Sequence, residues 1–176
     1  MFGSALFAPI ARAAGASLVA KMPVINDGPP TTAIFTAPQR ALMTALSERV
    51  MPTTDTPGAI TAGVPDYIEH MLGDWAIDDE RATIFGGLAA IDARSMADYR
   101  VPAVKATAAQ QDALLTLAMN DKLPGATDFF PAFKQLVLTG YYTSEVGITK
   151  EREYLPVPGE YDGAYPYAKV KRIFSS

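Results

Sequence analysis

Residues 127–142, TDFFPAFKQLVLTGYY, carry the heaviest apolar stripe in the chain. Phe129, Phe133 and Val137 follow one another at intervals of four residues, and Phe130 and Leu136 widen the stripe on the same side of a helix. Aromatic rings of this size usually anchor a hydrophobic core. The stretch therefore predicts a helix with a buried face, and we expect the other segments to pack around it.

A second helix is predicted at residues 36–50. It begins at Thr36 with a capping-box sequence, in which a threonine hydroxyl and a glutamine side chain satisfy free backbone N–H groups. Pro52 stops the helix shortly after its end. Because the apolar residues share one face, we expect Glu48 and Arg49 to point toward water.

Three further helices are predicted between these two. Residues 64–75 place apolar side chains on one helical face, with Trp75 among them. Residues 78–99 begin with three acidic residues, which the positive end of a helix dipole favours. A second capping box at Thr107 starts a helix that ends before Pro124.

These segments together predict the class of fold. No stretch alternates apolar and polar residues for long enough to indicate a sheet. We therefore expect a mainly α fold, a single-domain helical bundle of about five helices within residues 31–176. From about residue 143 we expect an extended tail, because Pro and Gly are frequent there and six of the eight tyrosines lie between residues 141 and 167.

The composition excludes several classes of protein. The chain has 176 residues with 15 Lys and Arg against 19 Asp and Glu, so a net charge of −4 argues against a nucleic-acid partner. It has no cysteine and one histidine, which excludes thiolate nucleophiles, disulfides, iron–sulfur clusters and multi-histidine metal sites. We predict that this chain itself binds no metal and no cofactor.

Residues 1–30 differ from the rest of the chain. Residues 1–20, MFGSALFAPIARAAGASLVA, contain no acidic residue but are too broken by Pro9 and Arg12 to span a bilayer as a helix. Two interpretations stay open. The segment is either an export signal that lacks its basic start or an apolar arm that docks on a partner.

His70 is the first candidate for chemistry. Asp66 precedes it by four residues and could hold the imidazole in one tautomer, as a general base or a metal ligand requires. We favour a partly exposed structural histidine over a site formed with Asp66 or Glu69, because no second histidine or cysteine completes such a site. The acidic residues 78–80 resemble paired catalytic carboxylates but fit better as residues that match a helix dipole.

The remaining candidates are expected to have structural roles. Thr143 and Ser144 lack the GxSxG sequence of an activated nucleophile, so we expect them to form a cap or a turn. Gly86 and Gly87 do not form the GxGxxG motif of a dinucleotide site. The three basic residues within 169–172 fit a solvated end of the chain better than a membrane anchor.

Four segments are less generic. They are MPTTDTPGA at residues 51–59, GV at 63–64, GYYTSEVG at 140–147 and PGEYDG at 158–163. In this order and spacing they resemble the gluconate 2-dehydrogenase subunit 3 family over about residues 36–167. The resemblance implies a small, mainly helical, non-catalytic subunit that binds a large FAD-containing subunit of the glucose-methanol-choline oxidoreductase type.

The resemblance also implies a location and an assembly. Such complexes oxidise sugars or sugar acids in the periplasm at the inner membrane and usually pass electrons to a multihaem cytochrome c subunit, so we expect membrane association only through partners. Small subunits of this family commonly carry a twin-arginine signal and help to export the folded partner. No Arg-Arg pair precedes the apolar stretch here, and a start site chosen too far downstream would explain this departure.

The positions expected to face the partner come from the motif segments and the tyrosine-rich tail, since protein interfaces favour tyrosine as an anchor. They are Pro57, Gly58, Tyr141, Tyr142, Tyr154, Tyr161, Tyr165 and Tyr167. Two alternatives remain. The tail tyrosines could form the sugar-stacking platform of a secreted carbohydrate-binding module, or a free-standing helical enzyme could use His70.

Overall fold

The computed structural model describes residues 33–154 and, beyond them, residues 159, 164, 166, 168, 174 and 175. The expected N-terminal arm or export signal at residues 1–30 lies outside the described residues, as do Tyr161, Tyr165 and Tyr167. The expected extended tail falls mostly on the same undescribed positions.

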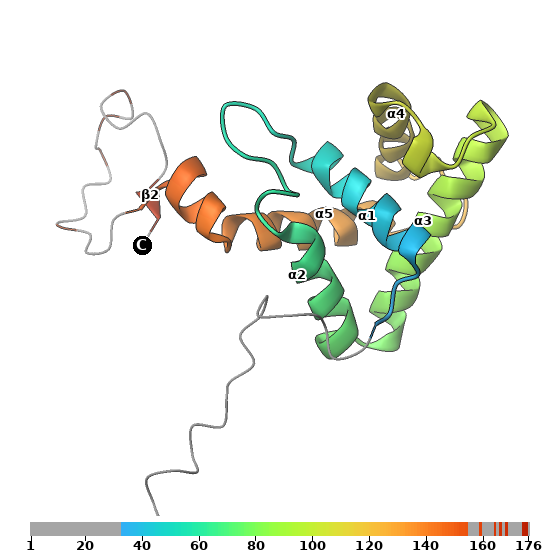
Figure 1. Ribbon diagram of the computed structural model, residues 1–176, viewed down its shortest axis with the longest axis horizontal. Coiled ribbons are helices and arrows are strands. Elements are labelled where there is room, and N and C mark those ends of the chain that lie inside the picture. Colours follow the sequence, from blue (N-terminus) through green and yellow to red (C-terminus); the bar gives the residue numbers. More distant parts are fainter. Residues whose placement is uncertain are drawn as a thin grey trace, which may run out of the picture.

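The described part of the chain contains five α-helices (Figure 1). They are α1 (Ala37–Val50), α2 (Val64–His70), α3 (Asp78–Tyr99), α4 (Ala108–Met119) and α5 (Phe129–Tyr142). Shorter elements are the π-helical turns η1 (Met71–Trp75) and η3 (Gly147–Glu151), the 3-10 turn η2 (Ala103–Lys105), and the strands β1 (Glu153–Tyr154) and β2 (Phe174–Ser175), which pair in parallel. The prediction of a mainly α, single-domain fold with about five helices is confirmed.

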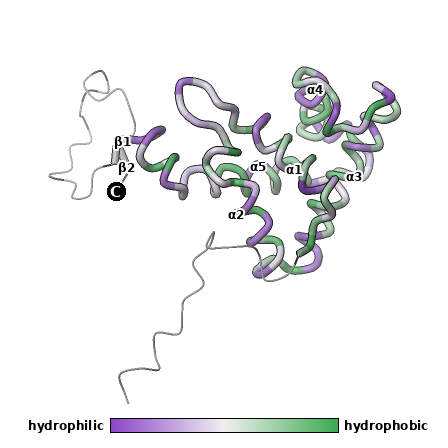
Figure 2. Tube along the Cα trace, in the orientation of Figure 1, coloured by the Kyte–Doolittle hydropathy of each residue, from purple (hydrophilic) through white to green (hydrophobic). Residues whose placement is uncertain are grey.

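Helix α5 lies at the centre of the bundle. It contacts each of the other four α-helices, and Phe129, Phe133 and Val137 on its buried face are 0% exposed. Figure 2 shows hydrophobic and hydrophilic residues interspersed along the helices. The Phe129, Phe133 and Val137 side of this stripe is therefore part of the core, as its spacing predicted.

The ends of the helices follow the local sequence signals. The hydroxyl of Thr107 accepts a hydrogen bond from the backbone N–H of Gln110 at 3.3 Å, and the Gln110 side chain accepts one from the backbone N–H of Thr107 at 2.9 Å. Thr36 and Gln39 form the same capping box at the start of α1. Both predicted capping boxes are thus confirmed.

The path after Gly140 corrects one expectation. We expected an extended tail from about residue 143, but the chain continues through η3 to Glu151. The backbone N–H of Arg152 donates to the carbonyl of Gly147, five residues back, which closes a π-helical turn. Among the described residues, no helix has both the length and the apolar composition that crossing a membrane requires.

Glu48 and Arg49 do not simply face water, so that prediction is wrong. The Arg49 guanidinium makes two hydrogen bonds of 2.7 Å to the carboxylate of Asp112 and thereby ties α1 to α4. Glu48 accepts hydrogen bonds from the loop that follows α1. The spacing of apolar residues within α1 indicated which side chains lie outside the core, but it could not indicate which other segments approach those side chains.

Trp75 also departs from its predicted place. Leu72, on the same predicted face, is 2% exposed, whereas Trp75 is 61% exposed. The backbone N–H of Ala76 donates to the carbonyl of Met71, five residues back, so the helix widens into a π turn before Trp75. This change of period rotates the indole away from the face that the α-helical spacing assigned to it.

Helices α3 and α5 pack closely at Gly87. A Cβ atom at Gly87 would lie 2.1 Å from two ring carbons of Phe129, whereas a Cβ at the neighbouring Gly86 would have its nearest contact at 3.7 Å. The absence of a side chain at Gly87 is therefore what lets the Phe129 ring approach α3.

We predict opposite effects of alanine at these two glycines. Gly87→Ala is expected to lower the free energy of unfolding by about 1–3 kcal/mol, because the methyl group overpacks the core against Phe129. Gly86→Ala is the matched control and should leave stability unchanged or raise it by up to about 1 kcal/mol, since alanine favours the helix. Urea unfolding measures both, and equal effects of the two variants would contradict the proposed packing.

Candidate functional site

The loop after α1 is held against the end of α5. The Tyr141 hydroxyl donates a hydrogen bond of 2.8 Å to the backbone carbonyl of Pro57, and the Thr56 hydroxyl donates one of 2.7 Å to the carboxylate of Glu151 in η3. These contacts bring together residues 51–59 and 140–151. We call this region the loop–helix junction. Two of the four distinctive sequence segments therefore meet in space although more than 80 residues separate them.

Tyr141 is the central residue of the loop–helix junction. Its side chain is 1% exposed, and burial raises the pKa of its phenol, so the hydroxyl stays protonated and able to donate. The hydroxyl thus satisfies a backbone carbonyl that the turn of the loop leaves unpaired. Tyr141 fixes the position of the loop relative to α5.

Glu48 shapes the loop from the other side. One carboxylate oxygen accepts hydrogen bonds from the backbone N–H of Thr53 at 2.9 Å and from its hydroxyl at 2.8 Å, and the other oxygen accepts one from the backbone N–H of Ile60 at 3.0 Å. Burial alone would raise the pKa of this carboxyl. The hydrogen bonds from Ile60 and Thr53 outweigh burial, so the pKa of Glu48 lies below its ordinary value.

Two glycines allow the chain to pass this close. A Cβ at Gly58 would lie 2.3 Å from a carboxylate oxygen of Glu48, and a Cβ at Gly147 would lie 2.1 Å from the carbonyl oxygen of Tyr141. Ser144 bridges the same turn, since its hydroxyl donates to that carbonyl at 2.6 Å and accepts from the Gly147 N–H at 3.0 Å. The predicted turn role of Ser144 is confirmed. Thr143 likewise donates to the carbonyl of Thr139.

The structure changes the interpretation of the predicted partner-facing residues. Gly58 and Tyr141 are buried in the loop–helix junction of this chain, and a partner contact at these two positions stays a prediction. Pro57 is half-buried, and so is Tyr142, whose ring lies 4.7 Å from the guanidinium carbon of Arg152. For these two residues a partner contact stays a prediction. The side chain of Tyr154 lies outside what the structure describes.

His70 is placed differently from the expectation. The side chain is 8% exposed rather than partly exposed, and its Nδ1 donates to the backbone carbonyl of Asp66 at 2.8 Å. The Asp66 carboxylate instead pairs with Arg40, which also donates to the carboxylate of Glu69 at 2.8 Å. His70 therefore anchors its own helix. No group of three His, Asp or Glu side chains in the described ranges is arranged to hold a metal ion.

The acidic residues at the start of α3 have the predicted structural role. A carboxylate oxygen of Glu80 accepts a hydrogen bond of 3.1 Å from the backbone N–H of Ile77, and Asp78 pairs with Arg81 at 3.2 Å. These contacts satisfy a free backbone donor and complement the positive end of the helix.

Sequence reasoning missed one exposed residue of interest. Trp75 was expected in the core, yet it lies at the surface beside Ile77, which is 64% exposed. The glycine and aspartate that precede Trp75 indicated an irregular helix end, which is the signal that could have cast doubt on its burial.

A family model described as gluconate 2-dehydrogenase subunit 3 matches residues 37–159. The match covers more than two thirds of the chain and includes all five described α-helices and the loop–helix junction. No curated protein and no solved structure matches the chain. The matched range agrees with the resemblance found in the four sequence segments.

We predict that Glu48→Gln lowers the free energy of unfolding at pH 7 by about 1–2 kcal/mol, because an amide cannot accept all three hydrogen bonds. The pKa of Glu48 lies below its ordinary value of 4.5 in the folded protein. Its contribution to stability is therefore complete above that ordinary value and is lost as the pH falls through the folded-state pKa.

Unfolding in urea at several pH values tests this prediction. The stability difference between the original chain and Glu48→Gln should shrink from pH 7 to pH 3. Glu145→Gln is the control, because Glu145 is exposed and its carboxylate should contribute little at either pH. A difference for Glu48→Gln that stays constant over this range would contradict the role assigned to the carboxylate.

Proposed function

Because the chain belongs to the gluconate 2-dehydrogenase subunit 3 family, we propose that it is the non-catalytic small subunit of an FAD-dependent sugar or sugar-acid dehydrogenase complex. Its partner is a large subunit of the glucose-methanol-choline oxidoreductase type, which holds the FAD and carries out the oxidation. The family match carries this proposal, since it extends over the whole described helical unit.

The roles of the candidate residues support a reaction centre in another chain. The His70 imidazole is nearly buried and bound to a backbone carbonyl, and the Ser144 hydroxyl is used twice within one turn. A flavin bound in the partner supplies the hydride and electron transfer chemistry. The task of this chain is then to stabilise the large subunit.

We place the complex in the periplasm, attached to the inner membrane through its other subunits, with electrons passing from FAD to haem c in a multihaem cytochrome subunit. The small subunit also assists the export of its folded partner through the twin-arginine route. These points rest on the family resemblance.

Purification from the native host tests the proposal. An affinity tag on this chain should retain a larger chain with a flavin absorption spectrum, and the complex should reduce an artificial dye in the presence of a sugar or a sugar acid such as gluconate. The same chain produced alone should show neither flavin absorbance nor dye reduction. Sugar oxidation by the chain alone, or a native preparation without a flavoprotein, would overturn the proposal.

We further predict that His70→Gln leaves the turnover of the purified complex within about twofold of the original, since His70 acts on its own helix rather than on substrate. Loss of turnover in an intact, flavin-containing complex would instead favour the enzyme that uses His70.

Calorimetric titration of the isolated chain with oligosaccharides should give no heat, whereas measurable binding would favour the carbohydrate-binding alternative.

A further inference from the structure

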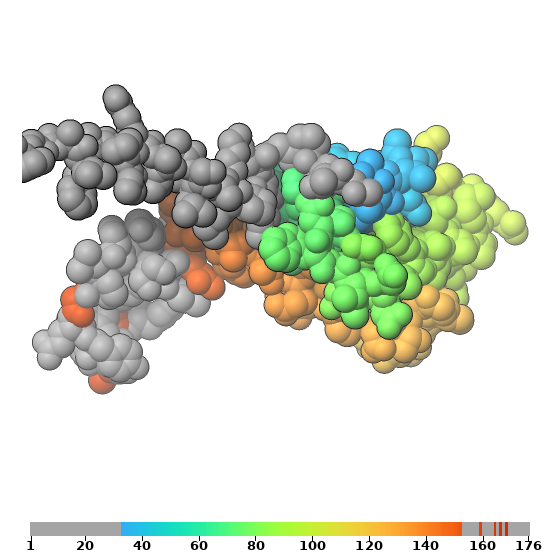
Figure 3. All heavy atoms as spheres, turned by 90° about the horizontal axis from the view of Figure 1, so that it is seen from below, coloured from blue at the N-terminus to red at the C-terminus, as the bar shows by residue number. Residues whose placement is uncertain are grey.

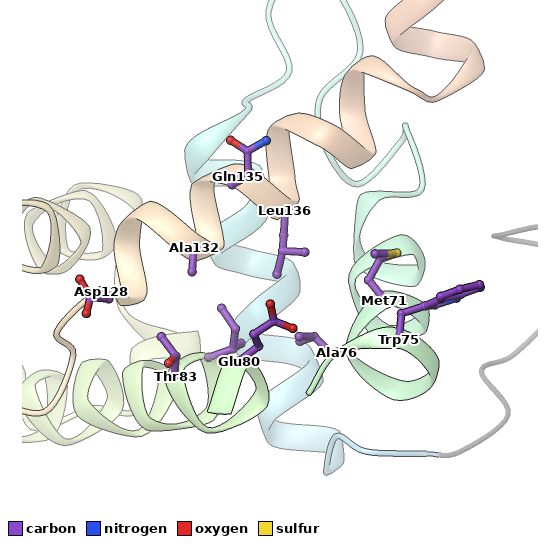
Figure 4. Close-up of a pocket in the computed structure, with 11 residues that line it drawn as sticks. Met71, Trp75, Ala76, Glu80, Thr83, Asp128, Ala132, Gln135 and Leu136 are labelled. Carbon is purple, nitrogen blue, oxygen red and sulfur yellow. The ribbon is translucent and has the colours of Figure 1, made fainter. Parts of the chain in front are cut away.

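A groove of about 410 Å³ opens between η1, α3 and α5 (Figure 4). Most of its lining is apolar and includes Met71, Leu72, Ile84, Ala132 and Leu136. Seen from below in Figure 3, the green segment of α2 and η1 and the orange α5 belong to the same face of the molecule. The groove is thus a surface feature built from three separate parts of the fold.

Trp75 stands at the edge of this groove. Figure 4 shows its indole extending from η1 away from α3 and α5, while Ala132 and Leu136 face the space between the helices. Trp75 and Ile77 are 61% and 64% exposed, the two most exposed large apolar side chains in the described part of the chain. An exposed tryptophan next to an apolar depression is typical of an anchor in a protein interface.

The charge around the groove is negative. The two charged side chains that line it are Glu80 and Asp128, and Asp78 and Asp79 are exposed beside them. The nearby Arg81 donates to the carbonyls of Leu72 and Gly73 and offsets the charge of Asp78, with which it pairs, so the negative charge comes from Asp79, Glu80 and Asp128. A ligand of this groove is therefore expected to carry apolar side chains flanked by basic ones.

The same features argue against a second copy of this chain as the occupant. In a symmetric dimer the same patch meets itself, so the acidic rims of the two copies would be brought together. Like charges placed face to face disfavour association. The exposed apolar area also continues past the groove to Ile77, which indicates an occupant that is larger than a small molecule.

We infer that this groove docks an apolar segment of the large flavin subunit, flanked by Lys or Arg, with Trp75 as the main anchor. This inference rests on the proposed function and adds the face on which the partner binds. It locates the partner on η1, α3 and α5, whereas the sequence motifs pointed to the loop–helix junction.

Site-specific crosslinking tests the location. A photoreactive phenylalanine analogue at position 75, incorporated in the native host, should crosslink this chain to the flavin subunit within the complex. The same analogue at Met119 is the control, since Met119 is 53% exposed on α4 and does not line the groove. Crosslinks from position 75 to residues 1–32 of the same chain, to a second copy, or to no protein would overturn the inference.

Affinity provides the second measurement. Trp75→Ser should weaken binding of the purified flavin subunit at least tenfold, and Met119→Ser should change it less than twofold. Circular dichroism checks that both variants fold, which is expected because both side chains are exposed. Equal binding by both variants would refute the inference while leaving the proposed function intact. Failure of the original chain to bind any flavoprotein would refute both.

Discussion

The contact between Phe129 and Gly87 is the constraint on which the arrangement of the helices depends. It sets how closely α5 approaches α3, and α5 in turn contacts every other α-helix in the described part of the chain. The buried stripe continues from Phe129 to Tyr141 at the other end of the same helix. One helix thus connects the close packing against Gly87 with the loop–helix junction, so a shift of α5 would disturb both.

The loop–helix junction turns a Pro-rich and Thr-rich loop into a defined surface. Glu48 accepts three hydrogen bonds from the loop, the Tyr141 hydroxyl donates to the Pro57 carbonyl, and the Thr56 hydroxyl donates to Glu151. A loop that is ordered before binding loses less conformational entropy when a partner arrives. This property suits a subunit whose proposed task is to stabilise another protein.

The π turn η1 links the core to the proposed docking face. Leu72 at the start of the turn is buried, and Trp75 three residues later is exposed. Turns of this kind often occur at functional sites, because the wider backbone redirects a side chain that a regular helix would bury. In this protein the wider turn places an indole beside an apolar groove with an acidic edge.

The sequence by itself determined where the helices lie, because capping boxes, prolines and the period of apolar residues are local signals that act within a few residues. It also determined that residues 127–142 contribute a buried helix face to the core, and its motif segments indicated the family. Only the tertiary structure decided which contacts individual side chains make and whether they are buried. Arg49 binds Asp112, which lies 63 residues away in the sequence, and Tyr141 donates a hydrogen bond to Pro57, 84 residues away. Trp75 is exposed rather than buried because the helix widens into a π turn. Such contacts depend on how distant segments approach one another, and no local pattern in the chain encodes that approach.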